Sequence, residues 1–204
     1  LCILSTKQRL IGSLGPKALT RAQQQEVARV SKQVATQAMT IVRDAGSRLP
    51  LSKEAGKLLV IGPELAGEQH PAADLAQALR KHVPSLEEAT MPLKPDKATR
   101  ERLITRAKGF ETVVVVTYQA WSRAYADQAA LVRELTQAGC EPIVVSTREP
   151  YDLLEFPDVG TFLAAYSANS ESMVAASEVM AGKAEAGGRL PVSLPGLYPV
   201  GHSK

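Results

Sequence analysis

Short apolar runs alternate with segments of helical periodicity along most of the chain. The clearest run is residues 112–117, with four consecutive valines, and runs without polar positions suit parallel strands buried on both faces. The pattern predicts strands at residues 58–61, 86–91, 112–117, 142–146 and 161–166, and an extended segment at 189–194. It predicts helices at residues 71–82, 97–108, 124–138 and 170–180, with a helical turn at 151–155.

This alternation predicts an α/β fold, namely an open, mostly parallel sheet with helices on both faces. The arrangement is the three-layer α/β/α architecture of Rossmann-like and flavodoxin-like domains. The strands at 112–117 and 142–146 are expected in the interior of the sheet. The segment at 189–194 is expected at an edge, because Pro191 lacks the N–H that an interior strand needs.

A long amphipathic helix is expected to precede the first strand. Thr20 and Gln23 have the spacing of an N-terminal capping box. Apolar residues then recur at intervals of three and four up to about residue 44, which predicts one helix face packed on the body of the domain. These residues are Val27, Val30, Val34, Ala38 and Ile41.

The N-terminal residues predict a chain that continues upstream. The sequence begins with Leu1, and Lys7, Gln8 and Arg9 interrupt the apolar positions that a signal peptide would need. We therefore expect a piece of a longer protein, with a processed N-terminus as the alternative. Residues 1–19 are interpreted as a connector from an upstream domain, and residues 20–204 as one α/β domain.

Composition and charge exclude several classes of protein. Hydrophobic residues make up 45% of the 204 residues and charged residues 22%, as in ordinary globular domains. The net charge of +3 comes from basic and acidic residues mixed along the chain, so no nucleic acid partner is expected. No apolar run approaches the ~20 residues of a membrane span. Two cysteines, Cys2 and Cys140, exclude a disulfide framework.

No motif for cofactor or metal chemistry is found. Residues 62–67 follow a predicted strand, but they lack the glycine spacing of a dinucleotide loop and the Lys-Ser/Thr pair of a P-loop. There is no G-x-S-x-G nucleophile elbow. His70, His82 and His202 do not pair at metal-ligand spacing. The sequence therefore predicts neither a cofactor nor a metal ion.

Candidate site residues lie in the loops that leave the carboxyl ends of the predicted strands, where open α/β sheets bind ligands. These loops are residues 62–67, 118–123, 147–151 and 167–170. Tyr118 and Trp121 are candidates to stack on a sugar or a partner domain, with local packing as the alternative. Arg148 and Asp152 are candidates for an ion pair, facing a partner or stabilising the loop. Tyr151 is a further aromatic candidate in these loops. Arg189 and the proline-rich tail are candidates to cover a sheet edge or to dock on a partner domain.

Five segments in order resemble the C-terminal domain of glycoside hydrolase family 3, in its β-N-acetylhexosaminidase branch. Residues 34–52 are similar to the link that enters this domain, and LLVIGPE at 58–64 is similar to its first strand. EPIVVSTREPYDL at 141–153 resembles a strand and turn that end in PYDL. FPDVGTFLAAYS at 156–167 and GRLPVSLPG at 188–196 resemble the next strand and the closing segment.

The resemblance implies a parent enzyme that removes terminal N-acetylglucosamine from cell-wall or chitin-type oligosaccharides. It implies that the catalytic residues lie in an N-terminal (β/α)8 barrel of the same polypeptide, joined through residues 1–19, so no catalytic residue is assigned to this chain. The expected role is a non-catalytic domain that stabilises the barrel and shapes its substrate cleft, with oligosaccharide at the interface. A secreted or cell-envelope location is favoured over the cytoplasm. The alternative is an independent Rossmann-like small-ligand binding or regulatory module; a self-sufficient flavodoxin-like enzyme is a third hypothesis.

Overall fold

The computed structural model describes residues 5, 18–52, 56–67 and 69–204. Contacts divide the chain into two units inside helix α2 (Arg21–Ala38), between Ser31 and Lys32. In the first unit, Thr20 N donates to Gln23 Oε1 at 3.0 Å and Gln23 N donates to Thr20 Oγ1 at 3.3 Å. These reciprocal bonds confirm the predicted capping box. The interpretation of residues 1–19 as a connector falls largely on residues outside those described and stays a prediction.

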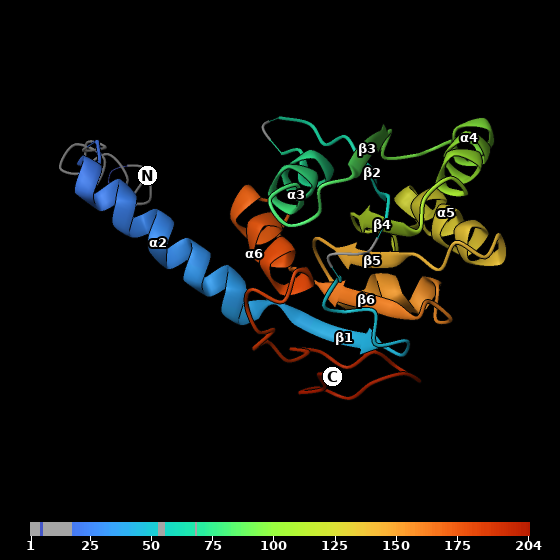
Figure 1. The fold of residues 1–204 in the computed structure, drawn as a ribbon. Helices are drawn as coiled ribbons and strands as arrows, with labels where there is room; N and C mark the ends of the chain where they lie inside the picture. Colours follow the sequence, from blue (N-terminus) through green and yellow to red (C-terminus); the bar gives the residue numbers. More distant parts are fainter. Residues whose placement is uncertain (1–4, 6–17, 53–55, 68) are drawn as a thin grey trace. The chain divides into compact units, whose positions relative to one another are not determined.

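The second unit is built on a six-stranded sheet in the order β1-β6-β5-β4-β2-β3. The strands are β1 (Thr40–Asp44), β2 (Leu58–Pro63), β3 (Leu86–Met91), β4 (Thr112–Thr117), β5 (Ile143–Ser146) and β6 (Thr161–Ala164). All neighbouring pairs are parallel except β1 with β6 (Figure 1). The predicted open, mostly parallel sheet is confirmed, and β4 and β5 lie in its interior with every residue buried.

Helices cover both faces of the sheet and close two separate cores. Helices α3 (Pro71–Leu79) and α6 (Ser170–Met180) pack on one face, and α4 (Lys97–Ala107) and α5 (Ala126–Gln137) pack on the other (Figure 1). Val113 and Val115 of β4 enter one core, while Val114 and Val116 enter the other. This alternation follows from the two-residue period of a strand. It explains why the valine run has no polar position. Short 3-10 segments η1 (Arg123–Tyr125) and η2 (Pro150–Glu155) follow β4 and β5.

The prediction of one leading helix up to residue 44 is wrong, because α2 ends at Ala38 and the chain continues as β1. Ile41 lies in this strand, where Thr40, Val42 and Asp44 point inward and are buried. The physical reason is that a short β-branched run pairs with the open edge of β6, and this pairing overrides the helical periodicity.

The predicted docked face of the leading helix is wrong at Val34, which lies in the second unit and is 59% exposed. Ala35 is the buried residue of α2 in that unit. Val27 and Val30 lie in the first unit, and their contact with the body of the domain stays a prediction.

The C-terminal segment runs along the β1 edge of the sheet, and it bonds to the backbone of Met39 and of β1 (Figure 1). Residues 189–194, predicted as an extended segment at an edge, belong to this tail and form no named strand. Gly188 N donates to Met39 O at 3.0 Å, and Lys204 N donates to Ile41 O at 2.9 Å. The side chain of Asn169 caps helix α6, because its Oδ1 accepts from Ser172 N at 3.0 Å.

Gly188 gives a test of how closely the tail packs on the strand edge. A Cβ at this position would overlap the carbonyl oxygen of Ala38 and the hydroxyl of Thr40. We predict that Gly188→Ala lowers the free energy of unfolding by about 1–3 kcal/mol, the usual cost of overpacking. Denaturant unfolding measures this change.

Gly187→Ala is the matched control. A Cβ at Gly187 meets its nearest atom, Gln37 O, at 3.5 Å, which is ordinary contact. Equal effects of the two substitutions would contradict close packing of the tail at Gly188.

Candidate functional site

Five of the six predicted site residues come together at the carboxyl ends of β4 and β5. Tyr118 and Trp121 lie in the loop after β4, which runs into η1. Arg148 lies in the loop after β5, and Tyr151 and Asp152 lie in η2. The ends of neighbouring parallel strands lie at one edge of a sheet, so residues about 30 positions apart become neighbours.

Arg189 is the predicted residue that lies elsewhere. It belongs to the C-terminal tail, where its Nη1 donates to Gly201 O at 3.2 Å. This contact holds two parts of the tail together, and it gives Arg189 no role in the cluster.

The carboxylate of Asp152 is buried at the centre of the cluster. Its Oδ2 accepts from Thr117 Oγ1 at 2.6 Å and from Ser146 Oγ at 3.3 Å, and its Oδ1 accepts from Trp121 N at 3.1 Å. Burial raises the pKa of Asp152 to about 6, although these three donors act in the opposite direction. Asp152 thus joins the ends of two strands and the loop that carries Trp121.

Arg148 does not pair with Asp152, so the expected ion pair is not formed. Its Nη1 donates to Tyr118 Oη at 3.1 Å, and its guanidinium carbon lies 5.5 Å from the centroid of the Tyr118 ring. Its Nε lies 3.7 Å from Glu149 Oε1. The physical reason is that Asp152 faces the interior, while Arg148 points outward beside Glu149.

The aromatic side chains form two edge-on pairs around this loop. The Trp121 and Tyr151 rings lie 6.1 Å apart at 69°, and the Tyr118 and Tyr125 rings lie 6.3 Å apart at 65°. Trp121 Nε1 donates to Glu149 Oε2 at 3.4 Å, yet 44% of Trp121 remains exposed. The indole is therefore held in place while much of its surface meets solvent.

Gln128 in α5 is a positioning residue that sequence reasoning missed. It is fully buried, and its amide bonds both backbone groups of Tyr118, at 3.0 Å to the N–H and 3.1 Å to the carbonyl oxygen. Its Nε2 also donates to Leu93 O at 3.1 Å. The available signal was a polar residue in register with Leu131, Val132 and Leu135 on the apolar face of the helix.

A polar hollow of about 280 Å³ lies beside the aromatic cluster. It shares Arg148 and Glu149 with the cluster and reaches the loop before α3 and the loop after β6. The lining residues are Gln69, Arg148, Glu149, Tyr166, Ser167 and Ala168. The hollow thus lies at the same end of the sheet as the predicted ligand loops.

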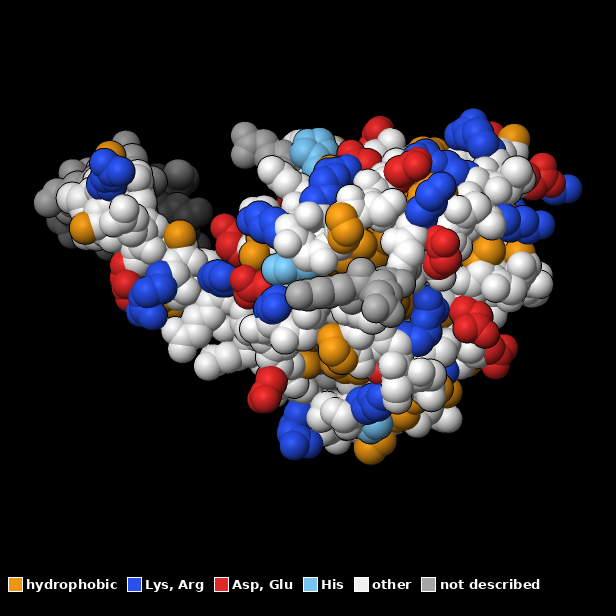
Figure 2. Space-filling view, viewed as in Figure 1, with side chains coloured by type: hydrophobic (Ala, Val, Ile, Leu, Met, Phe, Trp, Pro, Cys, Tyr) orange, Lys and Arg blue, Asp and Glu red, His pale blue; other side chains and the backbone are white. Residues whose placement is uncertain are grey.

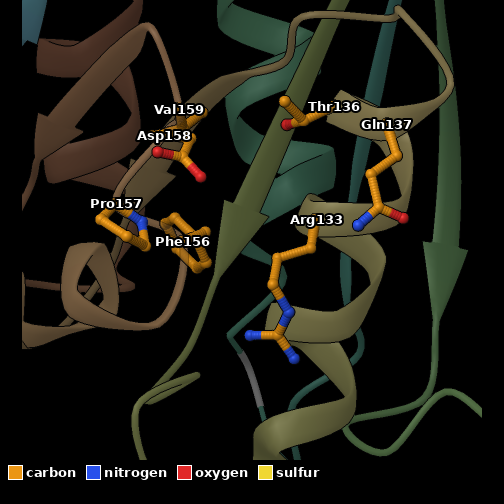
Figure 3. A pocket seen from close by; sticks show the side chains of 7 residues that line it. All are labelled: Arg133, Thr136, Gln137, Phe156, Pro157, Asp158 and Val159. Atoms are coloured by element: carbon orange, nitrogen blue, oxygen red, sulfur yellow. The ribbon is translucent and has the colours of Figure 1, made fainter.

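Another hollow lies between α5 and residues 156–159 (Figure 3). It measures about 100 Å³, and its Arg133 donates to Glu155 O at 2.7 Å. It is far smaller than the polar hollow, and none of the predicted site residues lines it. We therefore take the cluster around Asp152 and its neighbouring hollow as the candidate site.

The surface charges, the possible metal ligands and the lengths of the helices add three observations. On the face shown in Figure 2, basic and acidic side chains alternate over the surface and do not gather into one patch. Within the described ranges, no group of three or more His, Cys, Asp or Glu side chains could hold a metal ion. No helix in the same ranges is long and apolar enough to cross a membrane.

Asp152 gives a pH-dependent test of the cluster. Because the pKa of Asp152 is raised from 3.8 to about 6 in the folded state, the folded chain binds this proton more tightly than the unfolded chain does. Its contribution to stability is present below pH 3.8 and is lost as the pH rises through about 6. We predict that the free energy of unfolding of the wild type, minus that of Asp152→Asn, falls by roughly 3 kcal/mol across this window.

Denaturant unfolding at a series of pH values measures this difference. Asp158→Asn is the control, because Asp158 is exposed in its loop and its replacement should change stability by no more than about 0.5 kcal/mol. A constant difference between wild type and Asp152→Asn over the window would contradict the prediction.

The comparisons with family models and with solved structures point to the same family. Residues 39–198 match the model of the glycosyl hydrolase family 3 C-terminal domain. A comparison with curated proteins finds no match. Among solved structures, a glycoside hydrolase family 3 β-N-acetylglucosaminidase from Paenibacillus sp. str. FPU-7 has a TM-score of 0.72 and 28% identity, over 88% of this chain and 34% of that chain.

More distant structures share the fold. A fungal multi-domain family 3 β-N-acetylglucosaminidase has a TM-score of 0.73 and 24% identity, over 86% of this chain and 20% of that one. A β-glucosidase from Listeria innocua has a TM-score of 0.71 and 16% identity, over 89% and 29%. The chain thus spans about a third or less of these enzymes. Since the family model matches most of its residues, the chain belongs to the glycosyl hydrolase family 3 C-terminal domain family.

Proposed function

We propose that this chain is the C-terminal domain of a β-N-acetylglucosaminidase that releases terminal N-acetylglucosamine from cell-wall or chitin-type oligosaccharides. The observation that carries the proposal is the 28% identity to the Paenibacillus β-N-acetylglucosaminidase, over 88% of this chain. The 34% share of that enzyme's length supports a partner domain that supplies the rest.

The proposed role is non-catalytic support of an N-terminal (β/α)8 barrel in the same polypeptide. Hydrolysis by two carboxyl groups needs both to reach the scissile bond, at ~5 Å separation for retention or ~6.5–9.5 Å for inversion. The candidate site holds two carboxylates, Glu149 and Asp152. Asp152 has no exposed surface, and its two carboxylate oxygens accept hydrogen bonds from three donors. It therefore cannot contact a glycosidic bond unless the surrounding loops are disrupted.

The same site supplies a wall for a substrate cleft. Its loops expose Trp121 and Arg148 and leave Glu149 half-buried, so they offer an apolar face and charged groups of both signs. A barrel placed against this edge of the sheet would bring its own active site next to these side chains. We propose that the chain shapes the cleft in this way.

A second hypothesis is an independent Rossmann-like module that binds a small ligand. The hollow of about 280 Å³ favours it, because ligands of open α/β sheets bind at the carboxyl ends of the strands. The two hypotheses differ in what the gene encodes, since the first requires a barrel-coding region upstream in the same reading frame.

The experiment is release of a chromogenic group from an N-acetyl-β-glucosaminide. We predict that the 204-residue chain gives no turnover above a heat-killed sample, even in excess, and that the product of the full reading frame is active. Restored activity on mixing the chain with a separately produced barrel would support the role as a partner domain.

Glu149→Gln in the isolated chain is the control for unexpected activity. Turnover by the chain alone that this substitution abolishes would contradict the non-catalytic role. An inactive product from the full reading frame would contradict the proposed enzyme class.

A further inference from the structure

We propose that two adjoining hollows at the amino ends of β5 and β6 form a binding site for a short peptide. The peptide has a free ammonium group, a free carboxylate and a small aliphatic side chain on its first residue. The site lies at the end of the sheet opposite to the candidate functional site. The inference therefore goes beyond the proposed function and does not depend on it.

The larger hollow measures about 360 Å³ and lies where the loop after β1 meets the starts of β5 and β6. This volume falls within the ~300–1,000 Å³ range of small-ligand sites. Its charged lining residues are Arg48, Glu141 and Asp158. A Cβ on Gly160, which also lines the hollow, would meet no atom within 4 Å beyond its chain neighbours. No side chain of the protein therefore fills the space over this residue.

The smaller hollow is the one between α5 and residues 156–159, and it adjoins the larger one because Thr136 and Asp158 line both. Figure 3 shows residues 156–159 on one side of it and α5 on the other. Two of its lining residues, Phe156 and Val159, are buried and give it an apolar floor. With ~30 Å³ for a water-sized group, its volume of about 100 Å³ holds roughly three methyl-sized groups. That space suits a side chain such as that of valine.

The charged groups of the hollows are available to both ends of a peptide. Arg48 donates through Nη1 to Glu141 O, and its guanidinium has no other hydrogen bond among the described residues. The carboxylates of Glu141 and Asp158 are exposed and accept no hydrogen bond within the described part of the chain. A guanidinium binds a carboxylate through its free N–H groups, and a carboxylate accepts from an ammonium group.

The lining residues also determine the order of groups along the peptide. Asp158 lines both hollows, so an ammonium group bound to it lies where they meet. The side chain that enters the apolar hollow then belongs to the same, first residue, because both groups leave one Cα. Arg48 lines only the larger hollow, where it binds the carboxylate at the other end of the peptide.

The balance of charge selects against simple ions. Arg48 and Arg133 bring two positive charges to the hollows, and Glu141 and Asp158 bring two negative charges. A lone anion would meet the two carboxylates, and a lone cation would meet the two guanidinium groups. A peptide with one charge of each sign meets an opposite charge at each end.

The two loops that form the site are held in place by their own hydrogen bonds. Buried Asp44 accepts from Arg48 N at 2.8 Å and from Thr161 Oγ1 at 3.1 Å, which fixes the loop after β1. Arg43 donates to Val159 O at 3.1 Å, which joins the second loop to β1. A site that is shaped before the ligand arrives loses less entropy on binding.

Amide proton–nitrogen correlation spectra of the 204-residue chain test the site. The probe is L-valylglycine. We expect it to shift the signals of Gly46, Val159 and Gly160, which line the hollows, and to leave those of Gly62 and Trp121 at the other end of the sheet unchanged. The expected dissociation constant is of the order of 1 mM, since few contacts are made.

Three analogues of the probe each lack one of its groups. L-valylglycinamide lacks the carboxylate, and glycylglycine lacks the aliphatic side chain; each should bind about 10-fold more weakly. N-acetyl-L-valylglycine lacks the ammonium charge and should bind about 3-fold more weakly or worse, because the Asp158 carboxylate that it loses is exposed to solvent.

Two variants remove the matching groups of the protein. Arg48→Gln should weaken binding of L-valylglycine about 10-fold, because the guanidinium is half-buried and its bonds to a carboxylate are charge-assisted. Asp158→Asn should weaken it about 3-fold, and its small expected effect on stability keeps the test valid if Arg48→Gln fails to fold. Arg102→Gln is the matched control, because Arg102 is exposed in α4 and lines neither hollow.

Several results would overturn the inference. These are unchanged spectra at about 20 mM L-valylglycine, roughly twenty times the expected dissociation constant; equal binding of L-valylglycine and glycylglycine; equal binding to wild type and Asp158→Asn; or equal weakening by Arg102→Gln and Arg48→Gln. The dispersion of the amide signals shows whether each variant is folded.

Discussion

The hydrogen bonds of the buried Asp152 carboxylate hold the functional end of this domain together. They connect the last residue of β4, the last residue of β5 and the backbone of Trp121, which otherwise belong to separate loops. A buried carboxyl is costly to ionise unless donors surround it. The chain provides three donors, and the loop geometry around Trp121 and Tyr151 depends on them.

The sheet beneath this cluster is rigid because each interior strand belongs to both cores. In β4, alternate valines enter opposite cores, so a shift of the strand would disturb both layers of helices. Gln128 extends this rigidity into the loop, because it joins α5 to the backbone of Tyr118. The candidate site thus combines a rigid base with the exposed side chains of Trp121 and Arg148 and the half-buried Glu149.

The sequence predicts the parallel sheet well because its signal is local. The runs at 58–61 and 113–116 are apolar at every position, and such runs are typical of strands covered on both faces. Strand β1 was missed because residues 40–44 continue the spacing of α2, and their partner β6 lies more than 100 residues away. Strand pairing between residues this far apart in sequence cannot be predicted from a short window of sequence.

The same reasoning explains which site residues could be found. Tyr118, Trp121, Arg148, Tyr151 and Asp152 were found because the ends of parallel strands converge. Arg189 was selected on a sequence motif, and no local pattern shows that the tail folds back along β1. The partner of Asp152 was misassigned because Arg148 and Asp152 are close in sequence and carry opposite charges, which suggests an ion pair. In the structure the carboxylate accepts instead from the hydroxyl groups of Thr117 and Ser146, at the ends of two strands.

The two edges of the sheet are protected in different ways, and this difference has a consequence for association. Along β1, the carbonyl oxygens of Ile41, Val42 and Asp44 are occupied by His202 and Lys204 of the same chain. Along β3, protection comes from exposed charge pairs, Arg106 with Glu87 and Arg80 with Glu88. Salt screens exposed charge pairs strongly, whereas the part-buried bonds along β1 are screened much less. Edge-to-edge pairing between molecules, the usual start of β-aggregation, would therefore begin at β3 in concentrated salt, whereas the β1 edge would open only when the tail is displaced.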